Sequence, residues 1–594
     1  MRELSVNALK VLEKRYLLKD ARGRSVECPK HMFKRVACNI AKADAKYGAK
    51  HSAIAATARE FFSMMSSLDF LPNSPALMNA GTSLQQLSAC FVLPVEDTME
   101  SIFDALKSTA LIQQSGGGTG FSFSHLRPAG DVVRSTSGVS SGPVSFMKAF
   151  NMTTEVVKQG GKRRGANMGI LRYDHPDIEQ FVRCKASGTE LTNFNISVAV
   201  SDYFMAAVEH NSVFPLLNPR TGAQQGSMNA RKLFNLITQM AWLNGDPGLV
   251  FLDRINKDNP TPKLGAIEAT NPCGEVPLLP YESCNLGSIN LAHMLLTKGE
   301  KHEFDWAKFR QCIHSGVRFL DNALDMSRFP LPAIAKAVRR TRKIGLGVMG
   351  FADCLILLGM RYDSREALEF GEKIARFLNE QAFAASQKLA EERGPFEAWR
   401  ESIYGPHGRN IKVRNATRTT IAPTGTLSII ANCSSGIEPI FAVSYVRHVL
   451  EGANLLEVNP AFEKIAREKG FYSERLMRKI ACTGTLRGLH EIPRAARPLF
   501  ITARELRPEV HVCMQAAFQR HIDNAVSKTV NFPASATVAD VRRAYMLAYK
   551  LGCKGITIYR DTSREGQVLS VGAGAKKSTP AEAEDSQLRH CSTC

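Results

Sequence analysis

A thiol and a carboxylate lie two residues apart in the segment Asn271-Pro272-Cys273-Gly274-Glu275. In an extended segment alternate side chains point the same way, so the amide, the thiol and the carboxylate would face one site. Pro272 and Gly274 are poor strand formers, which favours a tight loop tip over a regular strand. Such a tip can hold a reactive sulfur beside a base. A cysteine in a turn is more often a small buried hydrophobe, however, so the segment alone does not establish catalysis.

Other cysteines stand in contexts that could complete a redox site. Cys284 follows eleven positions after Cys273, and Cys90 stands between apolar residues, where a lone cysteine is usually structural. The chain ends in a Cys-x-x-Cys motif, Cys591 and Cys594. A zinc site would require two further ligands, and His590 is too close to Cys591 for a usual site. A dithiol on a mobile tail suits thiol–disulfide exchange, although an idle tail has the same sequence.

Two loops could bind an anion. The run Gln114–Gly120 is rich in glycine, which permits close approach to a ligand or a tight turn, but it lacks the Lys-Ser/Thr ending of a Walker A loop. An expected strand, Thr417–Ile421, leads into Pro423-Thr424-Gly425-Thr426-Leu427. Small hydroxyl residues and glycine before a helix favour phosphate binding by exposed N–H groups. A capped helix start without a ligand is the alternative.

The bulk composition describes an ordinary globular protein that is strongly basic. The chain has 594 residues, of which 44% are hydrophobic, and its formal net charge is +20. No apolar run approaches the roughly 18 residues of a membrane span, and the N-terminus lacks the apolar region of a secretory signal. Fourteen scattered cysteines suit a reducing compartment, so a cytoplasmic location is expected. The basic residues form only short clusters, such as Lys162-Arg163-Arg164. Because no basic helix accompanies them, a stable nucleic-acid complex is not expected.

The sequence divides into three regions. Residues 1–70 have apolar residues at helical spacing, whereas residues 71–570 mix strand and helix signals. Phe194–Val200 alternates as a strand does, and Glu366–Arg393 is periodic as a helix. A second short strand is expected at Gly555–Tyr559. This mixture predicts an α/β fold. Residues 571–594 have few large apolar side chains and are expected to form a flexible tail.

Several of these motifs together resemble the ribonucleotide reductase family. Asn271–Glu275, the paired Cys90 and Cys284, the Pro423–Leu427 loop and the terminal Cys-x-x-Cys occur in the order seen in that family. The chain is most similar to the class II form, which uses adenosylcobalamin, from about residue 4 to residue 570. The resemblance implies a ten-stranded α/β barrel in which a central finger loop carries Cys273. Other stretches carry the same resemblance: Leu71–Gly81, Ser115–Ser124, Ser141–Met147 and Lys554–Asp561.

The resemblance also implies a role for each residue of the finger loop and the cysteine pair. Cys273 would form a thiyl radical that abstracts the 3'-hydrogen of a ribonucleotide, and Glu275 would accept the 3'-hydroxyl proton. Cys90 would protonate the departing 2'-hydroxyl, after which Cys90 and Cys284 would supply two electrons and form a disulfide. Asn271 would hold the substrate in place.

Substrate, effector and reductant sites follow from the same resemblance. The substrate, expected to be a ribonucleoside diphosphate, would place its diphosphate on Pro423, Thr424, Gly425, Thr426 and Leu427. The other implied substrate contacts are Ser74, Ala89, Cys90, Gly118, Asn271, Pro272, Cys273, Gly274 and Glu275. A deoxynucleoside triphosphate effector would bind Lys162, Arg163 and Arg164 with the nearby segment Cys184–Asn193. The tail cysteines Cys591 and Cys594 would re-reduce the disulfide and be recharged by a thioredoxin-like or glutaredoxin-like protein.

Two alternatives come from different classes of protein. A class I large subunit would receive its radical from a partner protein and would be expected to carry an adjacent tyrosine pair late in the chain. No Tyr-Tyr pair occurs, and Tyr559 stands alone at the comparable place. A basic nucleic-acid-binding protein on a reductase-like scaffold would have little reason to keep the cysteines, Asn271 and Glu275. A homodimer is expected, and no metal site is expected among the residues.

Overall fold

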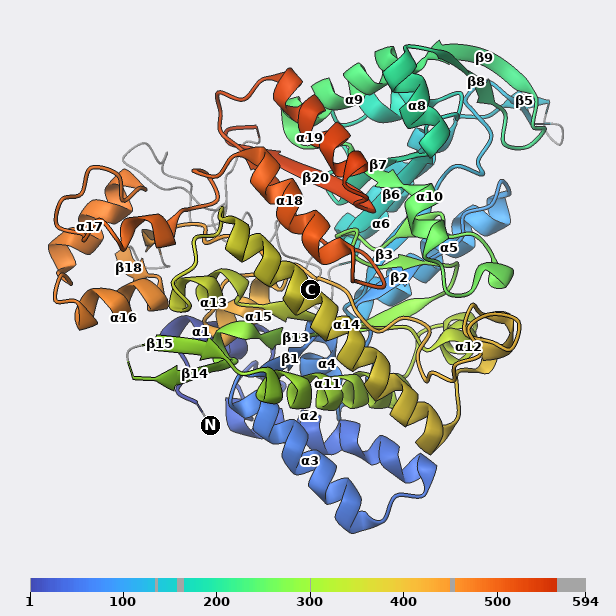
Figure 1. Ribbon diagram of the computed structural model, residues 1–594. Coiled ribbons are helices and arrows are strands. Elements are labelled where there is room, and N and C mark those ends of the chain that lie inside the picture. The colour runs from blue at the N-terminus through green and yellow to red at the C-terminus, as the bar shows by residue number, and fades with distance from the viewer. Residues whose placement is uncertain (1, 134–136, 158–164, 300, 449–453, 564–594) are drawn as a thin grey trace.

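The N-terminal region is helical, as predicted. The computed structural model describes residues 2–133, 137–157, 165–299, 301–448 and 454–563 (Figure 1). In this view the helices of residues 29–41 and 51–66 lie at the bottom of the molecule, and the helix of residues 6–15 lies higher. The region buries apolar side chains such as Leu12, Phe33 and Val36. The elements of this region are α1 (Val6–Arg15), α2 (Pro29–Ala41), the 3-10 helix η1 (Lys42–Tyr47) and α3 (His51–Ser66).

Five parallel strands form the first half of the main sheet. They lie side by side in the order β2 (Cys90–Val92), β3 (Gly118–Ser122), β6 (Asn167–Arg172), β7 (Phe194–Val200) and β10 (Gly248–Phe251). The predicted strand Phe194–Val200 is thus confirmed as β7. The connections run through α5 (Met99–Gln114), α6 (Pro143–Val156), α7 (Ile178–Arg183), α8 (Asp202–His210) and α9 (Ala230–Asn244).

The second half also runs parallel within itself. Its named strands are β13 (Ser283–Asn290), β16 (Ile344–Met349), β19 (Thr529–Phe532) and β20 (Gly555–Arg560). Between β16 and β19 an extended segment, residues 418–421, bonds to Leu346 on one side and to Ala525 on the other. The helices of this half are α11 (Trp306–Met326), α14 (Arg365–Arg393), α18 (Pro508–Gln519) and α19 (Val538–Lys550).

The predicted strand Thr417–Ile421 forms only isolated bridges, at Thr419 and Ile421. The Arg418 N–H donates to the Asp523 carboxylate rather than to a neighbouring strand. Side-chain acceptors therefore replace part of the regular ladder, although the segment still occupies a strand position.

The two halves close into a barrel because they pair with each other at two joins, and the strands run antiparallel at both. β13 pairs with β2 at one join, and β10 pairs with β20 at the other. The predicted α/β barrel is confirmed, and its sheet contains ten strands when the short β1 (Phe70–Pro72), which pairs with β13, is counted.

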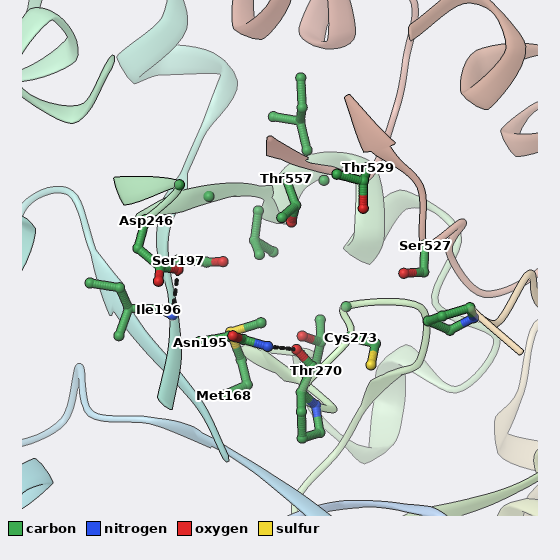
Figure 2. A pocket seen from close by; sticks show the side chains of 18 of the residues that line it. Met168, Asn195, Ile196, Ser197, Asp246, Thr270, Cys273, Ser527, Thr529 and Thr557 are labelled. Atoms are coloured by element: carbon green, nitrogen blue, oxygen red, sulfur yellow. Dashed lines mark hydrogen bonds between the residues drawn. The ribbon is translucent and has the colours of Figure 1, made fainter. Parts of the chain in front are cut away.

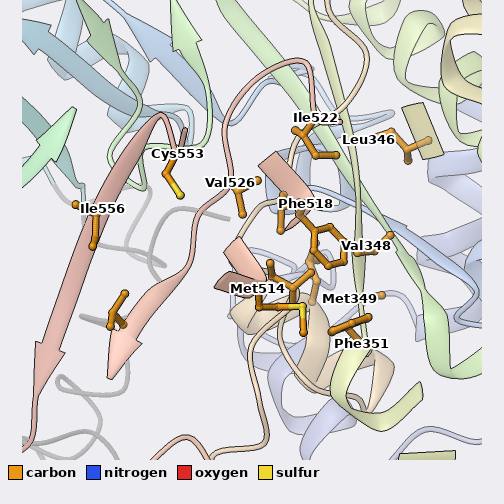
Figure 3. Packing of buried hydrophobic residues seen from close by; sticks show 14 of the residues in the cluster. Leu346, Val348, Met349, Phe351, Met514, Phe518, Ile522, Val526, Cys553 and Ile556 are labelled. Carbon is orange, nitrogen blue, oxygen red and sulfur yellow. The ribbon is translucent and has the colours of Figure 1, made fainter. Parts of the chain in front are cut away.

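Helices bury the outer face of the barrel. In Figure 3, Phe518 and Met514 of α18 approach Val348 of β16 and Phe351. The Phe351 and Phe518 rings meet edge to face with centroids 5.3 Å apart, a favourable aromatic geometry. This dry layer fixes the position of the strands that carry the site.

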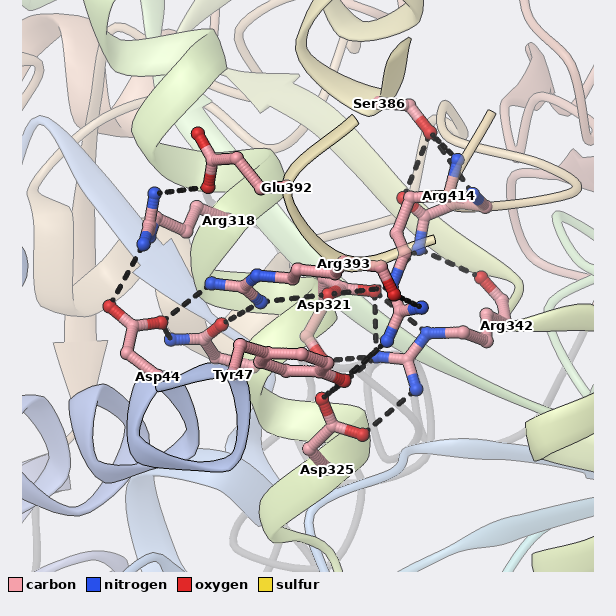
Figure 4. A network of polar contacts seen from close by, with 12 residues as sticks. Asp44, Tyr47, Arg318, Asp321, Asp325, Arg342, Ser386, Glu392, Arg393 and Arg414 are labelled. Atoms are coloured by element: carbon pink, nitrogen blue, oxygen red, sulfur yellow. Dashed lines mark hydrogen bonds and ion pairs between the residues drawn. The ribbon is translucent and has the colours of Figure 1, made fainter. Parts of the chain in front are cut away.

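A network of buried ions joins the N-terminal helices to the barrel helices (Figure 4). Asp44 of η1 pairs with Arg393 at the end of α14, at 2.6 Å, and Arg393 also pairs with Asp321 of α11, at 3.0 Å. Arg342 and Arg414 converge on Asp321 as well. The network fixes the N-terminal region against the barrel.

No helix among the described residues is both long and apolar enough to span a membrane.

The remaining elements are short or peripheral. These elements are α4 (Ser74–Asn79), β4 (Val132–Val133), β5 (Gly138–Val139), β8 (Val213–Leu217), β9 (Gln224–Asn229), α10 (Leu252–Lys257), β11 (Ala269–Thr270), β12 (Pro277–Leu278), β14 (Leu295–Lys298), β15 (Lys301–Phe304), α12 (Pro332–Thr341), α13 (Phe351–Leu357), α15 (Gly425–Ala431), β17 (Ser444–His448), β18 (Asn454–Val458), α16 (Pro460–Glu468) and α17 (Glu474–Thr483).

Candidate active site

The segment that carries Cys273 is the tip of a hairpin inside the barrel. Its arms, β11 and β12, pair with each other. The carbonyl oxygen of Thr270 lies so close to β3 that a Cβ atom on Gly120 would come within 1.7 Å of it. At the tip, Gly274 has a φ of 79°, and its N–H donates to the Asn271 carbonyl at 3.0 Å. A tight turn therefore forms where the sequence predicts one.

The barrel wall holds this tip from both sides. Asn195 of β7 donates its amide N–H to the Pro272 carbonyl at 2.9 Å (Figure 2). On the opposite side, the Ala525 N–H and the Thr420 hydroxyl both donate to the Glu275 carbonyl, at 2.9 and 2.8 Å. A buried loop is stable only if its backbone polar groups are paired, and these contacts supply partners.

The predicted catalytic residues meet in one place. Cys90 of β2 lies directly opposite Cys284 of β13 in the antiparallel register. The Asn271 side-chain amide donates to Cys90 Sγ at 3.1 Å, and Cys90 Sγ lies 4.0 Å from Glu275 Oε1. All four of these residues are almost fully buried, whereas Cys273 is half-buried at the tip.

The environment keeps the paired thiols protonated. Burial, followed by the nearby Glu275 carboxylate, raises the pKa of Cys90 far above its usual value, and the Asn271 hydrogen bond only partly opposes this. Burial also raises the pKa of Cys284. At neutral pH both groups are therefore S–H donors rather than thiolates. They are suited to giving up protons and hydrogen equivalents to a substrate.

Cys273 borders a cavity of about 220 Å³ (Figure 2). The walls come from strands of both barrel halves, including β6, β7, β10, β19 and β20. Several of the side chains labelled in Figure 2 carry hydroxyl or amide groups. Among them are Asn195, Ser197, Ser527, Thr529 and Thr557.

The loop Pro423–Leu427 leads into α15, which begins at Gly425. The Thr424 hydroxyl accepts the Gly436 N–H at 2.7 Å, and no side chain caps the first turn of α15. The first N–H groups of a helix have no partner within it, so an uncapped start can receive an anion. Pro423 lines the same cavity as Cys273, which places this loop beside the finger tip.

The other predicted substrate residues lie around the cysteine pair or at a nearby helix start. Gly118 is opposite Cys90 in the β2–β3 register, and its N–H donates to the Ala89 carbonyl at 2.8 Å. Ser74 begins α4, and its hydroxyl is 2.7 Å from the Tyr16 hydroxyl.

Some predicted residues lie outside the part of the chain that the structure describes. These are Lys162, Arg163 and Arg164 of the effector prediction, and the tail cysteines Cys591 and Cys594. The second predicted effector segment, Cys184–Asn193, is described and connects α7 to β7.

Several supports of the site were not predicted from the sequence. Asn195 was noted only as an alternating strand residue, and Thr420 and Ala525 carried no signal beyond their local pattern. A buried ion pair, Glu282–Lys343, also lies beside the cysteine pair. Within the described residues, no cluster of three or more His, Cys, Asp or Glu side chains is placed to hold a metal ion.

Comparisons with known proteins agree on one family. The family model described as "Ribonucleotide reductase, barrel domain" matches residues 88–559, and "Ribonucleotide reductase, all-alpha domain" matches residues 2–85. The vitamin B12-dependent ribonucleoside-diphosphate reductase of Thermoplasma acidophilum is 51% identical, over 99% of this chain and 82% of that protein. Its namesake from Mycobacterium tuberculosis is also 51% identical, over 96% and 81%.

A solved structure supports the fold alone. The class Id ribonucleotide reductase alpha subunit of Actinobacillus ureae superposes with a TM-score of 0.76 at 24% identity, covering 94% of this chain and 97% of that one.

Proposed function

Because this chain belongs to the ribonucleotide reductase family, we propose that it reduces ribonucleoside diphosphates to 2'-deoxyribonucleoside diphosphates, with adenosylcobalamin as its cofactor. The observation that carries the proposal is the finger tip, which brings Asn271, Cys273 and Glu275 to the Cys90–Cys284 pair. The relatives at 51% identity are named vitamin B12-dependent, which favours this cofactor over radical delivery by a partner protein.

The cavity beside Cys273 fits the nucleoside end of this cofactor. Its walls offer hydroxyl groups from Ser197, Thr529 and Thr557, which can bond a ribose. Adenosylcobalamin supplies, when bound, the means of removing the hydrogen atom from a thiol. The half-buried position of Cys273 leaves its sulfur at the border between this cavity and the cysteine pair.

The remaining chemistry belongs to the protein's own side chains. The sulfur of Cys273 takes the 3'-hydrogen of the substrate, and Glu275 accepts the 3'-hydroxyl proton. Cys90 is kept protonated by burial and by Glu275, so it can donate its proton to the departing 2'-hydroxyl. Cys90 and Cys284 then give up two electrons and join as a disulfide. Cys273 finally returns the hydrogen to the 3'-carbon.

The substrate diphosphate would bind the N–H groups at the start of α15, from Gly425 to Leu427. The uncapped first turn and its position beside the finger tip support this. Ser74, Ala89 and Gly118 would complete the substrate contacts.

Regulation and recycling complete the proposal. A deoxynucleoside triphosphate would bind Lys162–Arg164 together with Cys184–Asn193. The dithiol Cys591/Cys594 would re-reduce the disulfide and be recharged by a thioredoxin-like or glutaredoxin-like protein. The active form would be a cytoplasmic homodimer.

The test is an assay with a ribonucleoside diphosphate, a dithiol and adenosylcobalamin. We expect deoxynucleotide together with a cobalt-coupled radical signal by paramagnetic resonance. Cys273→Ser should lower turnover by at least about a thousandfold, while Cys38→Ser, which replaces an exposed thiol on α2, should leave it unchanged. Turnover that requires a metal-loaded partner protein, or that survives Cys273→Ser, would refute the proposal.

A further inference from the structure

A buried ion pair lies beside Cys284 on the inner face of the barrel. Lys343 Nζ is 2.5 Å from Glu282 Oε2, and the two side chains are 1% and 3% exposed. Buried apolar side chains also line this part of the inner face, among them Val92, Leu278 and Leu286. Burying two charges costs more free energy than a neutral packing of the same volume would, so such a pair is a candidate for a functional role.

The strand register places Lys343 next to Cys284. Asn285 lies opposite Ile344 in the parallel β13–β16 pair, so one residue earlier Cys284 lies opposite Lys343. On the other side, Cys284 lies opposite Cys90. Neighbours across a sheet share a face, and so do residues two apart along a strand. Cys90, Cys284, Lys343 and Glu282 therefore all point into the barrel.

The finger loop contacts the same ion pair. The Leu279 N–H, just after β12, donates to Glu282 Oε2 at 2.8 Å. The charged groups that face Cys284 are thus Glu275 from the finger tip, Glu282 from the residue before β13 and Lys343 from the residue before β16. Cys90 contributes the facing thiol from β2.

These groups make the two thiols unequal. Burial and then Glu275 raise the pKa of Cys284, Lys343 lowers it, and Glu282 raises it again. For Cys90, burial, Glu275 and the neighbouring cysteines raise the pKa, and the group that lowers it is the Asn271 amide rather than a cation. Cys284, unlike Cys90, therefore has a neighbouring cation that stabilises a negative charge on its sulfur.

Building on the proposed function, we propose that Lys343, balanced by Glu282, is a positioning residue that makes Cys284 the leaving thiolate when the Cys90–Cys284 disulfide is reduced. A thiolate of the reducing dithiol attacks Cys90 Sγ, forming a mixed disulfide and breaking the bond to Cys284. Both electrons of that bond leave with Cys284 Sγ beside the Lys343 ammonium, and Cys284 then takes up a proton. The second thiol of the reductant attacks the mixed disulfide, releases Cys90, and leaves the reductant oxidised.

Two single variants separate this role from a structural one. Oxidised enzyme is mixed with dithiothreitol at pH 6 to 9, and recovery of single-turnover deoxynucleotide formation measures the rate of re-reduction. Since a leaving thiol of lower pKa departs faster, Lys343→Gln should slow re-reduction about threefold to tenfold, and Glu282→Gln should accelerate it about twofold. The pH dependence itself should remain that of the dithiothreitol thiol, because Cys284 carries no proton while it is in the disulfide. At every pH the rates of the two variants should differ from the wild-type rate in opposite directions.

A purely structural ion pair predicts a different pattern, because either substitution breaks it and both variants would lose rate together. If either single variant fails to fold, the double variant Glu282→Gln/Lys343→Gln keeps a neutral hydrogen-bonding pair. Its re-reduction should be slower than that of the wild type but faster than that of Lys343→Gln. The control, Arg127→Gln/Asp97→Asn, removes a partly exposed ion pair of 2.7 Å whose charges are not among those that shift the pKa of Cys90 or Cys284, and it should leave the re-reduction rate unchanged.

The outcomes also separate this role from the proposed function. Rate changes of the same sign in both single variants, or a double variant identical to the wild type, would overturn the role of Lys343. Failure of pre-reduced wild-type enzyme to form any deoxynucleotide would instead overturn the proposed function.

Discussion

The ion network around Asp321 and the site of the paired cysteines are both buried and polar, but they differ in how completely their polar groups are paired. In the ion network, Asp321 meets Arg342, Arg393 and Arg414 and also accepts from the Asn415 amide. In the cysteine site, Cys90 makes only weak contacts, an amide at 3.1 Å and a carboxylate at 4.0 Å. The Asp321 carboxylate is therefore fully paired with strong partners, while the Cys90 sulfur has weak partners and stays available for thiol–disulfide exchange.

The pKa shifts express the same difference. Burial alone would raise the pKa of Asp321, but Arg342, Arg414 and Arg393 together lower it to about 2. No comparable compensation acts on Cys90, whose pKa stays raised. Complete pairing fixes a charge and makes it inert, whereas incomplete pairing leaves a group ready to transfer a proton.

The largest expected effect of the following three variants is on turnover at the cysteine site. Glu275→Gln keeps the size of the side chain and the backbone bonds from Ala525 and Thr420, but it removes the proposed base. Turnover should fall by roughly 10²- to 10⁴-fold with unchanged thermal stability. Steady-state rates and a melting curve measure the two effects. Full activity in this variant would remove Glu275 from the reaction.

The variant Asp321→Asn tests the ion network around Asp321. Three buried guanidinium groups would lose their shared carboxylate, so the free energy of unfolding should fall by about 3–5 kcal/mol. Urea denaturation measures this loss, and the molecules that remain folded should keep their turnover. Asp363→Asn, which breaks a partly exposed pair with Arg361, is the control and should cost less than about 1 kcal/mol. A similar small cost at both positions would show that the network contributes little.

The smallest expected effect concerns the contact between the finger and the wall. Gly120→Ala would place a methyl group 1.7 Å from the Thr270 carbonyl oxygen, so the finger must shift. We expect about 1–3 kcal/mol of destabilisation together with lost turnover. Gly226→Ala on β9, where the nearest atom would be 3.7 Å away, should change neither. Normal turnover in Gly120→Ala would mean that the tip tolerates displacement.

Local patterns made much of the fold and site predictable. The alternation of Phe194–Val200 and the periodicity before Gly394 identified β7 and α14 almost to the residue. Pro272 and Gly274 restricted the backbone enough to indicate the finger tip. Family resemblance then supplied the barrel and the pairing of Cys90 with Cys284.

Contacts between distant segments could not be predicted in this way. Asp44 and Arg393 are 349 positions apart, and neither neighbourhood indicates its partner. In the sequence, Lys343 is only the last residue of a short basic run, Arg339–Lys343. The parallel register that brings it beside Cys284 is a property of the assembled sheet. The segment Arg418–Ile421 has a strand-like sequence, but competition from the Asp523 side chain decided its hydrogen bonding.

The antiparallel join between β2 and β13 links the catalytic cycle to the stability of the barrel. Cys90 belongs to one half of the barrel and Cys284 to the other. If the two cysteines form the proposed disulfide, each oxidation would link the two halves covalently at this join, and each reduction would break the link. A cross-link that spans so much of the chain restricts its unfolded forms. The oxidised enzyme would then be the more stable of the two forms, and reduction would return it to the less stable, active form.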